Sequence, residues 1–250
     1  MTKITFPTDE HHPYADMRAI ALAQKITSDF NPDVRIAGSD GIDFYSISSF
    51  DKDPRHFKNG GLQNEITQWQ NCQRAWIDAS PNADVVFLIG NHEDRLKRWL
   101  WRNPEIYGLQ ALEMENLLEF EGLGIQMADK GGLEVVYHDK LIIKHGSIVR
   151  KHSGYTARAE LEKETYDIST LSGHTHRGAQ VFQKTRHGVV SGVEGFCLCD
   201  TDPSYTNNPN WQNGLVLATV NDNAVQFELI SFYNKGNRKA ALWRGREYTA

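Results

Sequence analysis

Short apolar runs alternate with longer amphipathic stretches along the first half of the chain. Runs rich in β-branched and aromatic residues predict strands, whereas apolar positions three or four residues apart predict helices. The predicted strands are Ile4–Phe6, Asp33–Gly38 and Asp84–Ile89, and the predicted helices are Met17–Asp29, Leu62–Ala79, His92–Trp101 and Glu105–Glu119. This alternation of strands and helices favours parallel pairing of the strands.

The second half of the chain changes to a pattern dominated by strands. A hairpin is predicted around Asp139-Lys140, one further helix over Gly154–Lys163, and a loop near a functional site over Thr201–Asn213. The predicted strands are Glu134–His138, Leu141–His145, Ile168–Ser172, Ala179–Lys184, Gly188–Ser191, Phe196–Cys199, Leu215–Val220 and Val225–Ser231. The order of elements fits an α/β (α+β) fold in which one mixed β-sheet packs on a second and helices lie outside.

No Gly/Ser-rich or Pro-rich linker divides the 250 residues, so we expect a single domain over residues 1–250. In the helix over Leu62–Ala79, Trp69 and Trp76 fall on one face and are interpreted as core residues. The stretch 103–129 is a candidate small helical lid. Four glutamates give this stretch an acidic character that disfavours a polyanion: Glu113, Glu115, Glu119 and Glu121.

Composition and charge narrow the class of protein. Hydrophobic residues make up 40% of the chain and charged residues 24%, which is typical of a soluble globular protein. The net charge of −5 argues against a surface coated with DNA-binding charge, but not against a local basic patch. No apolar run of about 18 residues predicts a membrane span, and the N-terminal segment lacks the apolar stretch of a signal peptide. Three cysteines do not suggest a disulfide framework, which favours a reducing, cytoplasmic location.

Polar clusters follow the ends of the predicted strands. They are Asp9-Glu-His11, Asp40 within Ala37–Asp43, Gly90-Asn-His-Glu93, His145-Gly146 and Gly173-His-Thr-His176. Sites form beyond the carboxyl ends of strands in such sheets. Carboxylate, imidazole and amide-oxygen donors suit divalent metals such as Mn, Fe, Zn or Ni. One aspartate can bridge two ions about 3.5–4 Å apart, a separation that clamps a phosphate group.

Other polar residues carry weaker signals. With 10 histidines in the chain, some neighbouring pairs arise by chance. His56, His138, His152 and His187 are interpreted as surface or loop residues, and His12 is left open. Cys197-x-Cys199 is a weak metal signal because it lies in an apolar, strand-like stretch without a second pair. The ordered set of clusters at strand ends is more specific than any single pair.

In this order the clusters resemble the calcineurin-like metallophosphoesterases, whose pattern is DxH, GDxxD, GNHE/D, an isolated His and GHxH. The matching motifs extend from Asp9 to His176, and the tail with Asn210-Trp-Gln-Asn-Gly214 resembles a bacteriophage and bacterial subgroup. The resemblance implies two mixed sheets packed face to face between helices. It also implies a metal-dependent phosphoric ester hydrolase, a phosphatase or phosphodiesterase, in the cytoplasm of a bacterium or of a phage's host.

The resemblance assigns a role to each matching residue. Asp9, His11 and His176 would hold a first ion, and Asn91, His145 and His174 a second, with Asp40 bridging both. Two divalent ions are expected, with Mn first and Fe, Zn, Ni or Mg as alternatives, and a water or hydroxide between them would be the nucleophile. His92 would bind a phosphate oxygen and protonate the leaving oxygen, while Asp43 would orient His92 and favour its protonated form.

Two positions depart from the family pattern. Ser39 stands directly before Asp40 where the family has glycine, so either the turn shifts or the hydroxyl hydrogen-bonds behind the ligands. Phe44 stands where the related Ser/Thr protein phosphatases have a phosphate-binding arginine. Arg95, which matches GNHExR, and Arg177, beside His176, are the candidate substrate-binding residues, with a plain surface charge as the alternative for each.

The sequence leaves the substrate and the oligomeric state open. Basic and aromatic residues in Arg95–Trp101, and basic residues in Lys144–Arg158, suit a nucleotide or a single-stranded nucleic acid. A solvated helix face with core tryptophans explains the first stretch equally well. Three hypotheses follow: a hydrolase of phosphomonoesters, phosphodiesters or phosphoproteins; a nuclease of the same superfamily; and a non-catalytic, metal-binding scaffold. The complete motif set makes the scaffold the least favoured.

Overall fold

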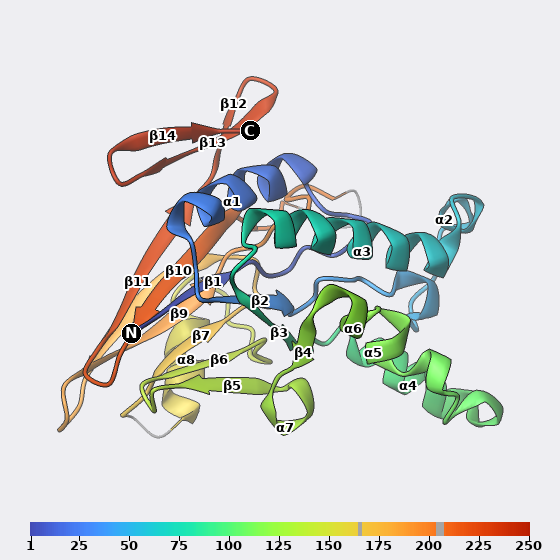
Figure 1. The fold of residues 1–250 in the computed structure, drawn as a ribbon, viewed down its shortest axis with the longest axis horizontal. Coiled ribbons are helices and arrows are strands. Elements are labelled where there is room, and N and C mark those ends of the chain that lie inside the picture. Colours follow the sequence, from blue (N-terminus) through green and yellow to red (C-terminus); the bar gives the residue numbers. More distant parts are fainter. Residues whose placement is uncertain (165–166, 204–207) are drawn as a thin grey trace.

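Two mixed β-sheets pack face to face, and helices cover their outer faces (Figure 1). The architecture is that of a computed structural model, which describes residues 1–164, 167–203 and 208–250. The larger sheet has the strand order β11 (Val225–Ser231), β10 (Gly214–Val220), β1 (Thr2–Phe6), β2 (Val34–Gly38), β3 (Asp84–Leu88) and β4 (Ile125–Met127). The smaller sheet has the order β5 (Glu134–Tyr137), β6 (Leu141–Lys144), β7 (Ser169–Ser172), β9 (Val189–Gly195) and β8 (Gly178–Lys184). The predicted fold class, α/β with two packed mixed sheets, is confirmed.

Parallel pairing brings the carboxyl ends of neighbouring strands together. Strands β1, β2, β3 and β4 are mutually parallel in that order, with Ile4 opposite Val34 and Ile36 opposite Val86. In the smaller sheet β6 is parallel to β7, and β7 is parallel to β9. The loops that leave β1, β2 and β3 therefore start at one edge of the larger sheet, and those that leave β6 and β7 start at one edge of the smaller sheet.

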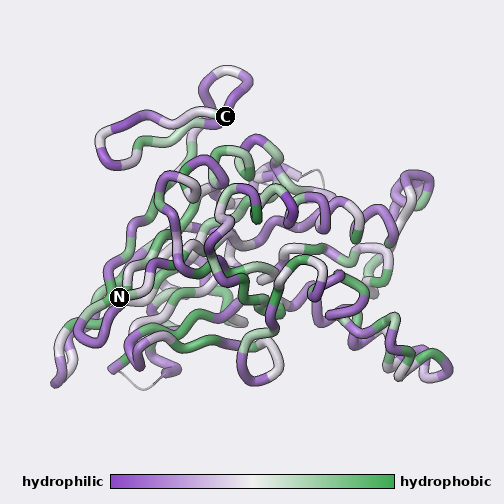
Figure 2. The backbone as a smooth tube through the Cα atoms, viewed as in Figure 1, coloured by the Kyte–Doolittle hydropathy of each residue, from purple (hydrophilic) through white to green (hydrophobic). Residues whose placement is uncertain are grey.

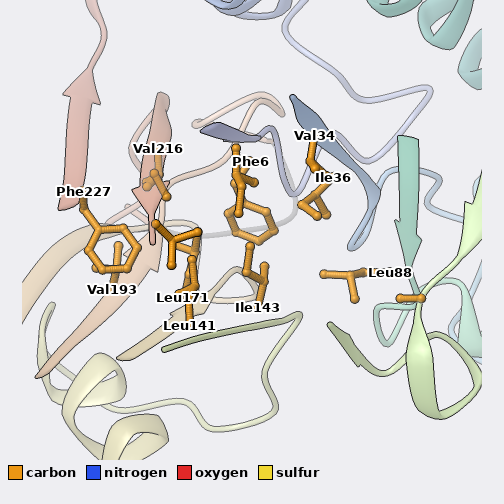
Figure 3. Close-up of a cluster of buried hydrophobic side chains, with 14 of the residues drawn as sticks. Phe6, Val34, Ile36, Leu88, Leu141, Ile143, Leu171, Val193, Val216 and Phe227 are labelled. Carbon is orange, nitrogen blue, oxygen red and sulfur yellow. The ribbon is translucent and has the colours of Figure 1, made fainter. Parts of the chain in front are cut away.

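The main core lies between the two sheets. Side chains of a strand point alternately to its two faces, so each strand contributes every second residue to this layer. Figure 3 shows Phe6 and Ile36 of the larger sheet facing Ile143 and Leu171 of the smaller sheet, and all four are fully buried. Hydropathy follows the same division, with hydrophobic strands inside and hydrophilic loops outside (Figure 2).

Helices α1 (Met17–Phe30) and α3 (Gly61–Ala79) cover the outer face of the larger sheet (Figure 1). Helix α1 begins after Asp16, whose carboxylate accepts hydrogen bonds from the backbone N–H groups of Arg18 and Ala19. Both Trp69 and Trp76 of α3 are fully buried, which confirms their interpretation as core residues. Helix α8 (Tyr155–Lys163) packs on β7, β8 and β9 of the smaller sheet. In the described part of the chain, no helix has the length and apolar character needed to cross a bilayer.

Two predictions about elements were wrong. The stretch Glu105–Glu119 is not one helix: it contains the 3-10 turns Pro104–Ile106 and Gln110–Leu112 and the short helix α5 (Met114–Leu117). Gly108, at φ 87°, takes a left-handed conformation that ends helical geometry between them. Phe196–Cys199 is not a strand, because Phe196 has φ 68° and Cys197 and Cys199 form only isolated bridges to Asn213 and Ala15.

The chain also forms elements that the pattern did not predict. After a short helix, α6 (Phe120–Leu123), strand β4 adds a parallel edge to the larger sheet, so the end of the 103–129 stretch belongs to that sheet. A third sheet of β12 (Tyr233–Lys235), β13 (Arg238–Trp243) and β14 (Arg246–Thr249) is antiparallel and packs beside α1 (Figure 1). The remaining short elements are the 3-10 turn Tyr45–Ile47 and the helices α2 (Pro54–Lys58), α4 (Asp94–Arg102) and α7 (Asp129–Gly132).

Candidate metal centre and active site

The polar clusters that follow β1, β2, β3, β6 and β7 converge on one place in the structure. In a first group, the Nε2 atoms of His11 and His176 lie 3.0 Å apart, and Asp9 Oδ1 lies 3.1 Å from His176 Nε2. In a second group, His145 Nε2 lies 3.1 Å from both Asn91 Oδ1 and His174 Nδ1. The two groups contain the same residues as the two ligand sets that the family resemblance implies.

Asp40 lies between the two groups. Its Oδ2 atom is 3.2 Å from His145 Nε2 in the second group and 4.0 Å from His11 Nε2 in the first. Its Oδ1 atom accepts a hydrogen bond of 2.8 Å from the backbone N–H of His92. One oxygen is thus fixed by the backbone while the other faces both groups, which is the arrangement that a bridging ligand requires.

The donors are chemically suited to two divalent ions. Carboxylate, imidazole and amide oxygen together form a donor set for Mn, Fe, Zn or Ni. Burial alone would raise the pKa of Asp40, but the facing His145 imidazole holds that pKa well below its usual range. Burial likewise opposes protonation of His145, yet the Asp40 carboxylate raises the pKa of His145 to about 9. The surrounding imidazoles thus keep the buried Asp40 carboxylate charged, and its negative charge would also favour a bound cation.

The backbone is held in a rare conformation at most of these positions. Asp9, His11, Asp40, His174 and His176 have φ between 52° and 72°, in the left-handed region that non-glycine residues seldom adopt. Each such residue costs of order 1 kcal/mol or more, and such residues cluster at functional sites. The loops are therefore shaped to direct donor atoms inward at a cost in stability.

Three side chains behind the donors fix the orientation of the imidazole rings. Ser39 Oγ lies 2.9 Å from His145 Nδ1, so the serine that replaces the usual glycine contributes a hydrogen-bonding partner behind a ligand. Asp43 Oδ2 lies 3.1 Å from His11 Nδ1, and Cys199 Sγ lies 3.8 Å from His176 Nδ1. Such partners set which ring nitrogen faces a metal ion.

Glu93 connects the loop after β2, which carries Asp40, to the loop after β3, which carries Asn91. Its buried carboxylate accepts hydrogen bonds from the backbone N–H groups of Gly90, Asp40 and Gly41, at 2.8 to 2.9 Å. Burial and the nearby Asp40 charge raise the pKa of Glu93 to about 7. The motif Gly90-Asn-His-Glu93 contained this residue, but its role could not be read from the sequence because the backbone groups that it contacts belong mostly to a different loop.

Gly90 is required by close packing against Asp40. A Cβ at position 90 would lie 2.1 Å from Asp40 Oδ1 and 2.5 Å from Asp40 N. We therefore expect Gly90→Ala to displace Asp40, to lower the free energy of unfolding by roughly 1–3 kcal/mol, and to reduce metal content. Thermal unfolding and elemental analysis measure both effects. Gly122→Ala is the matched control, because no atom lies within 4 Å of a Cβ there; equal behaviour of the two variants would contradict the packing argument.

His92, Asp43 and Arg95 form a second cluster beside Asp40. His92 Nδ1 lies 3.0 Å from Asp43 Oδ2, and His92 Nε2 lies 3.8 Å from Asp40 Oδ2. Arg95 donates to Asp43 Oδ1 at 2.7 Å and lies 3.1 Å from His92 Nε2. Burial opposes ionisation of Asp43, but hydrogen bonds from His11 and His92 hold its pKa well below the usual range. Asp43 is thus an ionised carboxylate that contacts both a candidate ligand and His92.

A cavity of about 690 Å³ opens beside these residues. Its lining includes His11, Asp40, Asn91, His92, Arg95, His174 and His176, together with Asp43 and several aromatic side chains. Residues 103–129, the predicted lid, are not among the residues that line it. The candidate ligands therefore border a space large enough for a small-molecule substrate.

Arg177 does not line this cavity. It is buried, and its guanidinium donates to the backbone carbonyl groups of Arg150 and Lys151 and lies 3.4 Å from Glu194 Oε2. His176 faces Asp9 and His11, whereas the Arg177 side chain points toward the backbone of residues 150–151. These contacts indicate that Arg177 stabilises the backbone at residues 150–151. They do not support its predicted contact with substrate.

Two further groups of donor side chains lie close to the centre. His176, Cys197 and Cys199 form one, and Glu10, His12 and Cys72 form the other; all are buried. The isolated CxC motif is thus brought to a candidate ligand, as the thiol contact with His176 shows. Glu10 also accepts a hydrogen bond from Trp76 Nε1 at 2.8 Å, which ties the loop after β1 to helix α3.

Comparisons with known proteins give remote similarities. No family model matches the chain. The chain is 24% identical over 245 residues to the "Gene 54 protein" of Mycobacterium phage D29, across 91% of this chain and 92% of that protein. Among solved structures, Vps29 from Chaetomium thermophilum aligns with a TM-score of 0.47 and 12% identity, over 100% of this chain and 98% of that one. A single mutant of Vps29 from Entamoeba histolytica aligns with a TM-score of 0.44 and 12% identity, over 99% and 97%.

Proposed function

We propose that this chain is a dinuclear metal-dependent phosphoesterase that hydrolyses small phosphomonoesters or phosphodiesters. The observation that carries the proposal is the position of Asp40, whose Oδ2 faces both donor groups while the His92–Asp43 pair lies beside the same carboxylate. Asp9, His11 and His176 would hold one ion, and Asn91, His145 and His174 the other. The similarity to a phage protein along nine-tenths of the chain agrees with the phage-type subgroup that the tail motif suggests.

Each part of the site has a distinct task in this reaction. The ions, Mn first among the candidates, would neutralise the phosphate and activate the attacking water. His92 would bind a phosphate oxygen and serve as the acid for the leaving oxygen through Nε2, the atom that faces the Arg95 guanidinium, while Asp43, at Nδ1, would fix the orientation of the ring. Arg95, which contacts His92 and Asp43, would hold a phosphate oxygen in place of the arginine that Phe44 replaces.

Arg95 provides a direct test of substrate binding. We expect Arg95→Gln to lower kcat/KM for a small phosphate ester about 10- to 100-fold, because a hydrogen bond between charged groups is lost. Metal content should stay at two ions. Steady-state kinetics measure the effect, and Arg98→Gln is the control because Arg98 pairs with Asp94 on the exposed face of α4. An unchanged kcat/KM in Arg95→Gln would show that Arg95 does not bind substrate.

A metal-dependent activity screen tests the proposed function itself. The purified chain is chelated, reloaded with Mn, Fe, Zn, Ni or Mg, and given a phosphomonoester, a phosphodiester and plasmid DNA in parallel. Turnover of the small esters with intact DNA supports the proposal. Cleavage of DNA would favour the nuclease alternative, and two bound ions without turnover of any ester would favour a scaffold.

A further inference from the structure

Four aromatic side chains line the cavity beside the candidate metal centre. They are Tyr14, Tyr45, Phe50 and Trp211, called here the aromatic wall. None of the four belongs to the buried core, and Phe50 is 70% exposed. Four aromatic rings grouped on one polar cavity offer a contiguous apolar surface on which a ligand can pack.

Two rings of the aromatic wall, Tyr14 and Tyr45, are held in place before any ligand arrives. The Tyr45 hydroxyl donates to the Asp51 carbonyl oxygen at 3.2 Å and accepts from the Asp53 backbone N–H at 2.7 Å. The Tyr14 and Tyr45 rings meet edge to face with centroids 5.9 Å apart. Rings that are already fixed lose little conformational entropy when a flat group stacks on them.

The aromatic wall lies next to a candidate metal ligand, His176, and next to the candidate phosphate-binding residue, Arg95. The Trp211 ring lies 4.3 Å, centroid to centroid, from that of the candidate ligand His176. On the other side, the Arg95 guanidinium lies 6.0 Å from the centroid of Phe50 while it contacts Asp43. A flat group attached to a phosphate can therefore reach an aromatic ring while the phosphate stays at the metal centre.

The charges around the cavity disfavour a long polyanion. Among the described residues of the lining, Arg95 is the only arginine or lysine, whereas Asp51 and Asp53 add carboxylates at the rim. A nucleic-acid chain needs a row of cations along its backbone. A single phosphate with one flat, hydrogen-bonding group fits the pocket better.

We propose that the substrate is a mononucleotide, with its phosphate at the metal centre and its base stacked on the aromatic wall. This rests on the proposed phosphoesterase function. In the reaction, the oxygen of water bonds to phosphorus and the P–O bond to the nucleoside breaks. The leaving oxygen keeps the electron pair of the broken bond and takes a proton from His92. The attacking water gives up a proton, which restores His92 through solvent, and the products are a nucleoside and inorganic phosphate.

Binding of adenosine monophosphate and ribose 5-phosphate to the Mn-loaded His92→Asn variant, measured by calorimetry, tests the proposal with turnover of both compounds suppressed. Stacking of one base is worth about 5- to 150-fold in affinity, so the adenine compound should bind more tightly by about that factor. Phe50→Ala should reduce the ratio of the two affinities several-fold. Phe182→Ala, which removes an equally exposed phenylalanine on β8 outside the cavity, should leave the ratio unchanged.

Equal binding of the two compounds, or an unchanged ratio in Phe50→Ala, would overturn the substrate proposal. Tighter binding of a single-stranded oligonucleotide than of the mononucleotide would overturn it as well. The outcomes separate the two proposals: hydrolysis of simple esters without a preference for the base rejects the mononucleotide alone. Preferential binding of the mononucleotide without hydrolysis of any ester rejects the phosphoesterase function and the reaction, and leaves the mononucleotide as a ligand of the aromatic wall.

Discussion

Asp40→Asn should abolish the metal pair and lower kcat/KM by at least about 1000-fold, because it removes the charge that both donor groups share. Loss of a residue that merely orients a ligand typically costs 10- to 100-fold, and Asp40 faces both groups directly. The amide oxygen of asparagine can still accept the His92 N–H hydrogen bond that Oδ1 accepts, so the loop should keep its shape. The change therefore tests charge and coordination rather than folding.

Elemental analysis and thermal unfolding measure this outcome together. We expect fewer than two ions per chain in the variant. With the ions removed from the wild-type chain and from the variant, both should still unfold cooperatively. Asp222→Asn is the matched control, because Asp222 is exposed and contacts only His138 among the described residues. Two tightly bound ions in Asp40→Asn would show that Asp40 is not a bridge.

His92→Asn should lower kcat about 100- to 10,000-fold while both ions stay bound, as expected for the loss of a general acid. The size of the loss should depend on the leaving group. An alkyl phosphate needs a proton on its leaving oxygen and should show the full effect, whereas a nitrophenyl phosphate, whose leaving group is a stable anion, should show much less.

Steady-state kinetics on the two esters, with metal analysis of the same samples, separate the acid role from a structural one. His187→Asn is the control because His187 lies on the surface with its side chain 72% exposed. An equal loss on both esters would indicate that His92 positions substrate or metal instead of donating a proton. Loss of an ion would place His92 among the ligands.

The motif residues could be grouped from the sequence because each follows a strand, and parallel strands end at a common edge. The contacts behind them could not be predicted in the same way. Asp43 was expected to contact His92, but its contact with His11 depends on how two loops from different strands approach each other. The side-chain direction of Arg177 likewise depends on the conformation of the chain after β7. Its charge suggested a role in substrate binding, and the structure buries it.

The errors in the fold have related causes. The 105–119 stretch has helical composition, but Gly108 interrupts it with a left-handed φ, so local geometry overrides propensity. The β12–β14 sheet escaped prediction because its strands are short and partly exposed, and its few buried side chains, such as Trp243 and Tyr248, find their partners on α1. A strand that packs on an element far away in the sequence can be predicted from its apolar residues only when the strand is long.

The pairing of β1 with β10 has a consequence for how the protein is made. Thr2 to Phe6 pair with Val220 to Val216, and His11 meets a histidine 165 residues further along the chain. At translation rates of about 5–20 residues per second, the first ligands leave the ribosome roughly ten seconds or more before their partners exist. Until then, the nascent chain carries unpaired strand edges and an incomplete ion-binding site. Loading with metal is therefore expected to be post-translational, and chaperones that shield the early strands should raise the yield of active protein.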